Sequence, residues 1–169
     1  MDTRILGRQL RPGEKGGEEI GPAKVGKGTK RMLVADGNGI PLALLISRAS
    51  RAEVKLAEAT LDRVRVPRRR GRPRKRPERL VADKAYDCDR LRSWLRRKGI
   101  IPCIPPRENR KGRRKRWEEE YKERWHVERT FAWVGNFRRL VVRYERLASM
   151  YEAFCILACI IICLRELLK

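Results

Sequence analysis

The feature that most constrains the fold of this chain is a β-hairpin pattern near its N-terminus. The runs TKRMLVAD (29–36) and IPLALLISRAS (40–50) are apolar and rich in β-prone residues, and the sequence Gly37-Asn38-Gly39 separates them. Glycine and asparagine readily adopt the positive φ angles that tight hairpin turns require. The sequence therefore predicts two adjacent antiparallel strands, and Asp36, which precedes a glycine, is interpreted as an ordinary turn residue.

Helical and strand-like patterns alternate after this hairpin. The predicted elements are, in order, a helix over 52–64, a strand over 79–83, a helix over 87–98, a short strand over 99–106, a helix from 117 past 137, and a helix over 148–168. Ser50 and Glu53 have the spacing of a capping box for the first helix. The last helix is apolar over most of its surface and is predicted to lie inside the fold. This alternation predicts an α/β fold with a mixed sheet.

The charge of the chain points to a polyanionic partner. Lys and Arg total 43 against 21 acidic residues, which gives a net charge of +22. Such an excess repels itself in a compact fold, so nucleic acid is favoured as the partner over an anionic membrane surface. The apolar run Phe154–Leu164 is shorter than the ~20 residues that a membrane span needs, so no membrane partner is expected.

The cysteines and the N-terminus indicate a cytoplasmic, nucleoid-associated location. The chain has five cysteines, an odd number, and no apolar export signal at its N-terminus. Reduced thiols in a cytoplasm explain this better than a disulfide framework. Cys155, Cys159 and Cys163 recur at every fourth residue and are interpreted as small core residues rather than as a metal site.

Residues 67–78 (PRRRGRPRKRPE) hold seven basic residues and three prolines, and predict a basic, extended insert. Its core, Arg70-Gly71-Arg72-Pro73, followed by Arg74, resembles an AT-hook, whose arginines enter the narrow minor groove. A flexible linker that binds DNA phosphates without base preference explains this basic, proline-rich sequence equally well. Residues 1–28 are rich in Gly, Lys and Glu and are predicted to form an extended arm before a catalytic domain over 29–169.

Two carboxylates stand out as candidates for chemistry. Asp83 follows a predicted core strand, at the end where α/β folds place ligands. Glu128 falls on the packed face of the long predicted helix, where an ionised carboxylate needs a cation. An ion pair with Arg124 or Arg129 explains Glu128 alone. Together with Asp83, however, it suggests an oxygen-ligand site for Mg²⁺ or Mn²⁺.

The motifs around these two acids are similar to those of a known enzyme family. VADKAYD (81–87) and YKERWHVERTFAWVGNFRRL (121–140) resemble the DDE transposases of bacterial insertion sequences, which have a ribonuclease-H-like catalytic core. In that family an Asp at a strand end lies in a motif like D-K-G-Y-D, and the catalytic Glu lies in Y-x-x-R-x-x-x-E. Asp83 matches the first motif. Tyr121, Arg124 and Glu128 match the second.

The resemblance implies a ribonuclease-H-like mixed sheet flanked by helices, with Asp83 and Glu128 as catalytic metal ligands. It also implies two Mg²⁺ or Mn²⁺ ions, metal-dependent phosphodiester cleavage and strand transfer at insertion-sequence ends, and double-stranded DNA bound by a homodimer. The arginines expected to contact DNA are Arg70, Arg72, Arg74, Arg124, Arg129, Arg138 and Arg139. Further basic residues around the acids, Arg107, Arg110, Arg113, Arg114, Arg143 and Arg146, are expected to do the same, whereas Trp125 and Trp133 are predicted to lie in the core.

Three departures from the family pattern put activity in question. The family's first catalytic Asp ends an apolar strand upstream of the hairpin, but only Met1 precedes Asp2 here. The first strand is therefore expected to be missing or incomplete, and whether Asp2 or a lost upstream residue is the first acid stays open. Ala85 stands where the family has glycine, and Gly135 where it often has Lys or Arg. The resulting hypothesis is that this chain alone does not transpose DNA; the alternative is a non-catalytic basic DNA-binding protein.

Overall fold

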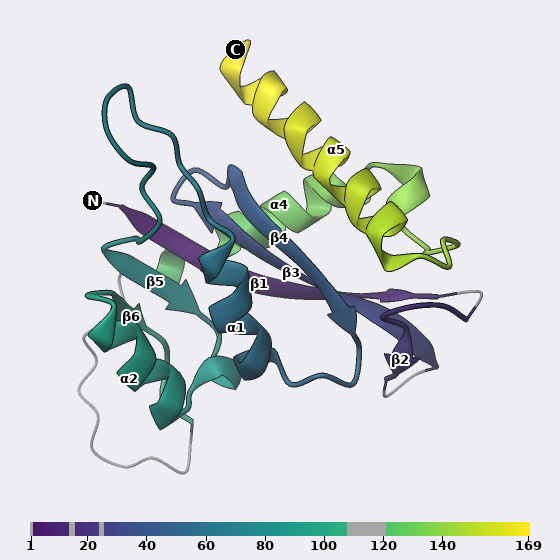
Figure 1. Ribbon diagram of the computed structural model, residues 1–169, viewed down its shortest axis with the longest axis horizontal. Coiled ribbons are helices and arrows are strands. Elements are labelled where there is room, and N and C mark those ends of the chain that lie inside the picture. Colours follow the sequence, from purple (N-terminus) through teal and green to yellow (C-terminus); the bar gives the residue numbers. More distant parts are fainter. Residues whose placement is uncertain (1, 14–15, 24–25, 108–120) are drawn as a thin grey trace.

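A mixed sheet of six strands forms the centre of the computed structural model, which describes residues 2–13, 16–23, 26–107 and 121–169 (Figure 1). The strands are β1 (Thr3–Pro12), β2 (Gly21–Pro22), β3 (Lys27–Asp36), β4 (Pro41–Arg48), β5 (Arg79–Ala82) and β6 (Ile101–Cys103). Their order across the sheet is β4-β3-β1-β5-β6, and β2 pairs with the start of β3. β1, β3 and β4 are antiparallel, whereas β5 and β6 run parallel to β1. The predicted mixed α/β sheet is confirmed.

The first strand is present, contrary to the prediction of an extended arm. Residues 3–12 form β1 at the centre of the sheet, paired with β3 on one side and with β5 on the other. Only Ile5 and Leu6 are fully buried apolar residues in this strand, so its apolar signal is short. Its polar second half is held by backbone pairing to β3, from Arg8 opposite Met32 to Pro12 opposite Gly28. Such long-range pairing leaves little trace in local composition.

The predicted hairpin is confirmed as β3 and β4. The Asp36 carboxylate closes the turn, because its Oδ1 accepts hydrogen bonds from the backbone N–H groups of Asn38 at 2.9 Å and Ile40 at 2.8 Å. Gly39 has a φ of +81°, a conformation that favours glycine. Asp36 is thus a structural turn residue, as predicted.

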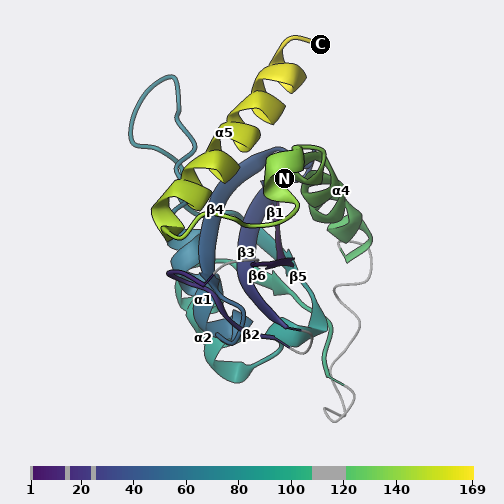
Figure 2. The ribbon, with the colours of Figure 1, turned by 90° about the vertical axis from the view of Figure 1, so that its right-hand side faces the viewer.

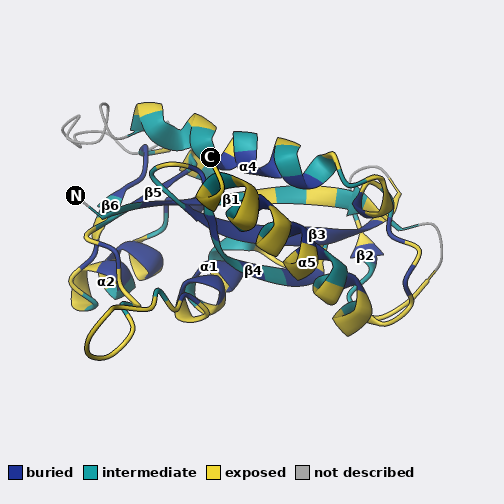
Figure 3. Ribbon diagram, turned by 90° about the horizontal axis from the view of Figure 1, so that it is seen from above, coloured by how far each residue is buried: buried dark blue, intermediate teal, exposed yellow. Residues whose placement is uncertain are grey.

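Helices cover both faces of the sheet (Figure 3). On one face α1 (Glu53–Asp62) and α2 (Asp89–Arg97) bury a core with Leu6, Met32 and Val34. On the other face α4 (Trp125–Gly135) and α5 (Ala148–Leu167) enclose a second core, which contains Ile5 and Leu33. The helices predicted near these positions are confirmed, except that α4 ends at Gly135 and does not continue past Phe137, which is extended. Residues 117–120 lie outside the described part of the chain.

The predicted capping box of α1 is wrong. The N-cap residue is Ala52, which makes no side-chain cap hydrogen bond. Glu53 instead pairs with Arg8 at 2.9 Å and with Lys30 at 3.4 Å, so its carboxylate fastens α1 to the sheet. The presence of two cations on neighbouring strands explains why the local capping pattern is not used.

The terminal helix α5 lies on the surface, which corrects the prediction that it is buried. A single stripe, Tyr151, Cys155, Ala158 and Ile162, faces the sheet. Other apolar residues on α5 are exposed, among them Leu157 at 54%. The helix extends past the sheet (Figure 2), so the sheet covers only one of its faces. By length and composition alone α5 is apolar enough to cross a membrane, and 22% of its most apolar window is buried.

Of the three cysteines of α5 that were predicted to lie in the core, Cys155 is buried in it and Cys159 packs against it, whereas Cys163 is only partly buried and lies outside that cluster. All five cysteines of the chain are free thiols. Burial raises the pKa of the Cys155 thiol and raises that of Cys159 to about 12. Because the thiolate is the metal-binding form, these two groups are neutral packing residues at physiological pH.

A candidate catalytic site at the end of β5

Asp83 occupies the position that the sequence predicted for it. Leu80, Val81 and Ala82 of β5 are fully buried, and the chain leaves the sheet at the next residue. Asp83 then caps the 3₁₀ turn Lys84–Tyr86, because its Oδ1 accepts a hydrogen bond from the Lys84 N–H at 2.6 Å. The side chain remains 37% exposed, so it is available to solvent and to a ligand.

Glu128 approaches the same point from the opposite layer. It lies in the first turn of α4, after the 3₁₀ turn Lys122–Arg124, and its neighbour Val127 packs into the core. Asp83 and Glu128 both line one cavity of about 190 Å³, together with residues of β1. The fold therefore brings together the two carboxylates that the sequence singled out.

A guanidinium group bridges the two acids. Arg124 Nη1 lies 3.6 Å from Asp83 Oδ1, and Arg124 Nη2 donates a hydrogen bond to Glu128 Oε1. Nη1 also donates to the Tyr121 hydroxyl at 3.1 Å. Partial burial alone would lower the pKa of Arg124, but the hydrogen bond to Tyr121 and the two nearby carboxylates outweigh burial, so the pKa is raised. A permanent positive charge thus lies between Asp83 and Glu128.

The described residues do not fit a site for two divalent ions. They contain no group of three or more His, Cys, Asp or Glu residues placed to hold a metal. A pair of Mg²⁺ or Mn²⁺ ions needs many oxygen ligands, whereas Asp83 and Glu128 offer two carboxylates already paired with Arg124.

Asp2 does not supply the missing carboxylate. It precedes β1, beside the start of β5, and pairs with Arg4 at 3.2 Å and Arg74 at 2.9 Å. Asp83 lies at the other end of β5, one strand length away. With about 3.3 Å per strand residue, the five residues from Asp2 to Gly7 span about 16 Å. Asp2 is therefore excluded as the first catalytic acid in this structure.

A buried ion pair supports the loop that carries Asp83. Asp87 Oδ1 accepts a hydrogen bond from Arg92 Nε at 2.6 Å, and the two side chains are 0% and 6% exposed. The other oxygen of Asp87 accepts from the Arg107 N–H at 2.9 Å, and the Arg107 side chain donates to the Ala85 carbonyl at 3.0 Å. Ala85 is not among the residues with positive φ, so alanine in place of the family's glycine causes no backbone strain here.

The comparisons with known proteins agree with this geometry. A family model described as the transposase DDE domain matches residues 10–163. The chain belongs to the transposase DDE domain family. A putative transposase for insertion sequence element IS402 from Burkholderia cepacia is 40% identical over 137 residues, which cover 80% of this chain and 63% of the relative. The chain thus spans less than two thirds of the length of that curated relative.

A solved structure shares the fold of this DDE domain. It is the synaptic complex of piggyBac transposase with hairpin DNA, which matches with a TM-score of 0.56 at 10% sequence identity. The match covers 93% of this chain and 45% of that chain. At this low identity the likeness supports the ribonuclease-H-like fold of the domain and nothing about its ligands.

The arginines that the sequence assigned to DNA are spread over the domain. Arg124 lies in the acidic site, but Arg129 is turned away from Glu128. Arg129 donates to the Asn38 carbonyl at 2.6 Å and its guanidinium lies 4.5 Å from the Trp125 ring centre and 4.8 Å from that of Trp133. Trp125 is 50% exposed, so its predicted place in the core is wrong.

The arginines after α4 lie away from the two acids. Arg138 and Arg139 form the 3₁₀ turn beyond the last turn of α4, whereas Glu128 lies in its first turn. Arg143, expected to contact DNA, is completely buried and donates to the Glu18 carbonyl at 2.6 Å, so that prediction is wrong. The predicted contacts Arg110, Arg113 and Arg114 lie outside the described residues.

The basic insert forms a closed loop. Backbone hydrogen bonds of 3.0 and 2.8 Å join Val66 to Arg74, and Gly71 near the tip has a φ of +87°. The loop therefore turns at Gly71 instead of extending through it, as the AT-hook resemblance implied. Arg70 and Arg72 are exposed, whereas Arg74 pairs with acidic residues at the base of the loop.

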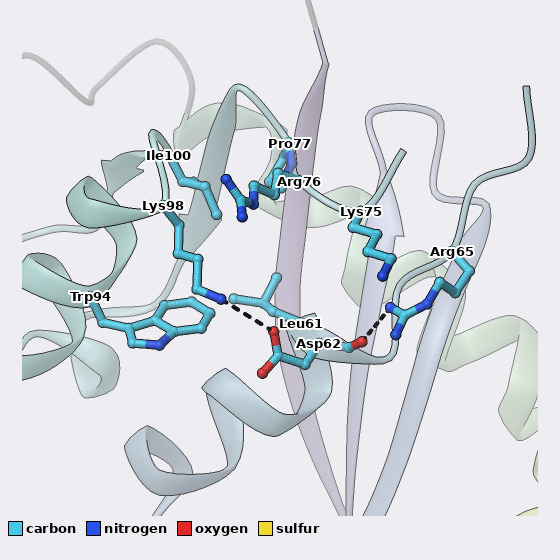
Figure 4. A pocket seen from close by; sticks show the side chains of 9 residues that line it. All are labelled: Leu61, Asp62, Arg65, Lys75, Arg76, Pro77, Trp94, Lys98 and Ile100. Carbon is cyan, nitrogen blue, oxygen red and sulfur yellow. Dashed lines mark hydrogen bonds and ion pairs between the residues drawn. The ribbon is translucent and has the colours of Figure 1, made fainter. Parts of the chain in front are cut away.

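Sequence reasoning missed a basic cavity beside this loop. The cavity has a volume of about 240 Å³ and lies between the insert, α1 and α2 (Figure 4). Its cationic lining residues are Arg65, Lys75, Arg76 and Lys98, against one acid, Asp62. Lys98 Nζ also lies 5.1 Å from the centre of the Trp94 ring, which forms part of the wall. Only the fold brings these distant basic residues together, although each lies in a visibly basic run of the sequence.

Proposed function

We propose that this DDE domain binds double-stranded DNA and that, with its present residues, it does not cleave it. The observation that carries the proposal is the cavity lined by Asp83 and Glu128, where the described residues supply no third carboxylate. Asp83 and Glu128 are proposed as two metal ligands of the family's catalytic centre. Membership of the transposase DDE domain family supports a DNA substrate.

The charge at the site explains the proposed lack of cleavage. When bound, a pair of divalent ions would supply stabilisation of the attacking and leaving oxygens in phosphoryl displacement. Among the described residues, Asp83 and Glu128 are the two carboxylates that line the cavity. Two carboxylates offer too little negative charge, and too few oxygen atoms, to hold two divalent cations against water.

A cleavage assay tests the proposal directly. We expect the purified chain, incubated with supercoiled plasmid in Mg²⁺ or Mn²⁺, to produce no more nicks than its Asp83→Ala variant. The reason is that both proteins lack a complete ligand set for the ions. Metal-dependent nicking that disappears in Asp83→Ala would refute the proposal.

The proposed DNA-binding surface includes the basic loop and the basic cavity. Arg70 and Arg72 on the loop are exposed, and Lys75, Arg76 and Lys98 gather around the cavity with a single acid among them. Cationic side chains that neutralise phosphates release counterions, which supplies most sequence-independent affinity. We also propose that the domain acts on DNA as a homodimer in the cytoplasm, as the family resemblance implies.

Neutralising the cavity should lower the salt dependence of DNA binding. In Arg76→Gln/Lys98→Gln we expect the slope of log K against log[salt] to fall by about one unit for each phosphate that the protein no longer neutralises. Fluorescence anisotropy with a labelled duplex at several salt concentrations measures this slope. Arg96→Gln/Arg97→Gln is the matched control, because these exposed residues of α2 do not line the cavity. An equal fall in the control would show that the cavity has no special role.

A further inference from the structure

The sheet register places Gly7 of β1 beside Asp83. Leu6 is paired with Ala82 across the parallel strands β1 and β5, so the residues that follow this pair are Gly7 on β1 and Asp83 directly after β5. Both residues line the same cavity as Glu128. Parallel neighbours lie about 4.8 Å apart across a sheet, which is within reach of a shared ligand.

A side chain at position 7 would point toward α4, the helix that carries Glu128. Side chains alternate between the two faces of a strand. Ile5 belongs to the core under α4 and α5, and Leu6 to the core on the opposite face, so position 7 faces α4. By the same alternation Val81 and Asp83 face α4 as well. Three parts of the fold therefore contribute to the same cavity: position 7 of β1, Asp83 after β5, and Glu128 of α4.

Because residue 7 is glycine, it places no side chain in the cavity, and side chains of α4 occupy the space. A Cβ atom added to Gly7 would lie 2.9 Å from both Cγ atoms of Val127 and 3.0 Å from Phe131 Cε2. Gly7 is not among the glycines with positive φ, so its backbone conformation does not require glycine. A glycine inside a strand weakens it unless something approaches closely, and here the approaching group is Val127.

We infer that Gly7 marks the lost third carboxylate of this site. β1 is the strand upstream of the hairpin, where the family resemblance locates the first acid, and no other described carboxylate lies beside Asp83 and Glu128. This inference rests on the proposed roles of Asp83 and Glu128 as metal ligands. It attributes the proposed inactivity of the chain to the absence of one side chain. It also predicts that a carboxylate at position 7 would restore metal binding.

Recovery requires two substitutions. An aspartate at position 7 adds the carboxylate, and alanine at position 127 removes the methyl groups that occupy its space. Arg124 does not prevent recovery, because its partners Asp83 and Glu128 are 37% and 58% exposed, and ion pairs so open to water contribute little. Three convergent carboxylates then compete for a divalent ion.

Titration with Mn²⁺ in the absence of DNA, followed by calorimetry, tests the inference. We expect Gly7→Asp/Val127→Ala to bind Mn²⁺ at least about tenfold more tightly than the unchanged chain. The matched control Gly7→Asn/Val127→Ala has the same shape without the charge and should gain nothing. Adding Asp83→Asn to the aspartate variant should abolish the gain.

Three results would overturn the inference. They are saturable Mn²⁺ binding by the unchanged chain, no gain in the aspartate variant, and an equal gain in the asparagine control. If three carboxylates repel enough to unfold the aspartate variant, Mn²⁺ must restore its helical circular dichroism and leave the asparagine control unaffected. Because no DNA is present, this outcome is separate from the cleavage assay, which tests the proposed function alone.

Discussion

Replacing Asp87 by alanine is expected to lower the free energy of unfolding by about 3–5 kcal/mol, because it leaves a buried charge without its partner. The Asp87 side chain is completely buried, and its ion pair with Arg92 has a separation of 2.6 Å. Arg92 also donates to the Ile104 carbonyl at 2.7 Å, so its guanidinium is held in place when the carboxylate is removed. Urea denaturation followed by circular dichroism measures the change.

Two further variants show whether the loss of stability in Asp87→Ala comes from an unpaired buried charge or from the removal of any acid. Asp62→Ala removes an exposed acid whose ion pair with Lys98 is 4.0 Å long, and we expect it to change stability by less than about 1 kcal/mol. Asp87→Leu/Arg92→Met removes both charges and should restore much of the loss, because no buried charge remains. A loss below about 1 kcal/mol in Asp87→Ala would contradict the interpretation of the pair as buried and coupled.

The parts of the site with strong local signals were predictable from the sequence. The apolar run before Asp83 is short and ends in a carboxylate, and the strand ends at the same place in the structure. The spacing of Arg124 and Glu128 is that of an i,i+4 helical pair, and the two side chains do pair. That Arg124 also pairs with Asp83 was not predictable, because this contact depends on how α4 crosses the end of β5.

Two of the errors, on β1 and on Arg143, share one physical cause, which is long-range pairing of polar groups. β1 was missed because its polar half is stabilised by backbone hydrogen bonds to β3, and with β1 the position of Gly7 was missed too. Arg143 was assigned to DNA because arginine is usually exposed. In the fold its guanidinium instead donates to the Glu18 carbonyl and to Thr29 Oγ1, at 2.6 Å each. Neither partner is near Arg143 in the sequence.

The burial of α5 was predicted wrongly for a different reason. A helix that is apolar on all sides is usually enclosed by other elements. In this chain β4, α4 and the turn Arg138–Leu140 pack against one side of it, at Tyr151, Cys155, Ala158 and Ile162, and its other side faces solvent. Composition shows how apolar a helix is, but the number of elements that pack against it is a property of the whole fold.

DNA binding by this domain is expected to weaken by about 10³–10⁵ between 50 and 200 mM salt if it neutralises roughly 6–10 phosphates. The net charge of +22 and the basic residues gathered around the cavity beside the insert make binding to that many phosphates reasonable. Each neutralised phosphate releases condensed counterions, and added salt opposes that release. Anisotropy titrations of one labelled duplex over this salt range measure the effect, and a nearly flat salt dependence would contradict it.

The same titrations, repeated with AT-rich and GC-rich duplexes, decide between the two interpretations of the insert. An AT-hook binds the minor groove with an extended backbone, whereas the loop here turns at Gly71 and is closed by the pairing of Val66 with Arg74. Opening that loop would break its backbone hydrogen bonds, so we expect equal affinity for both duplexes. Arg70→Gln/Arg72→Gln should then weaken both to the same extent, since the two exposed side chains contact phosphates. A preference for AT-rich DNA that this double substitution removes would show instead that the insert opens and enters the minor groove.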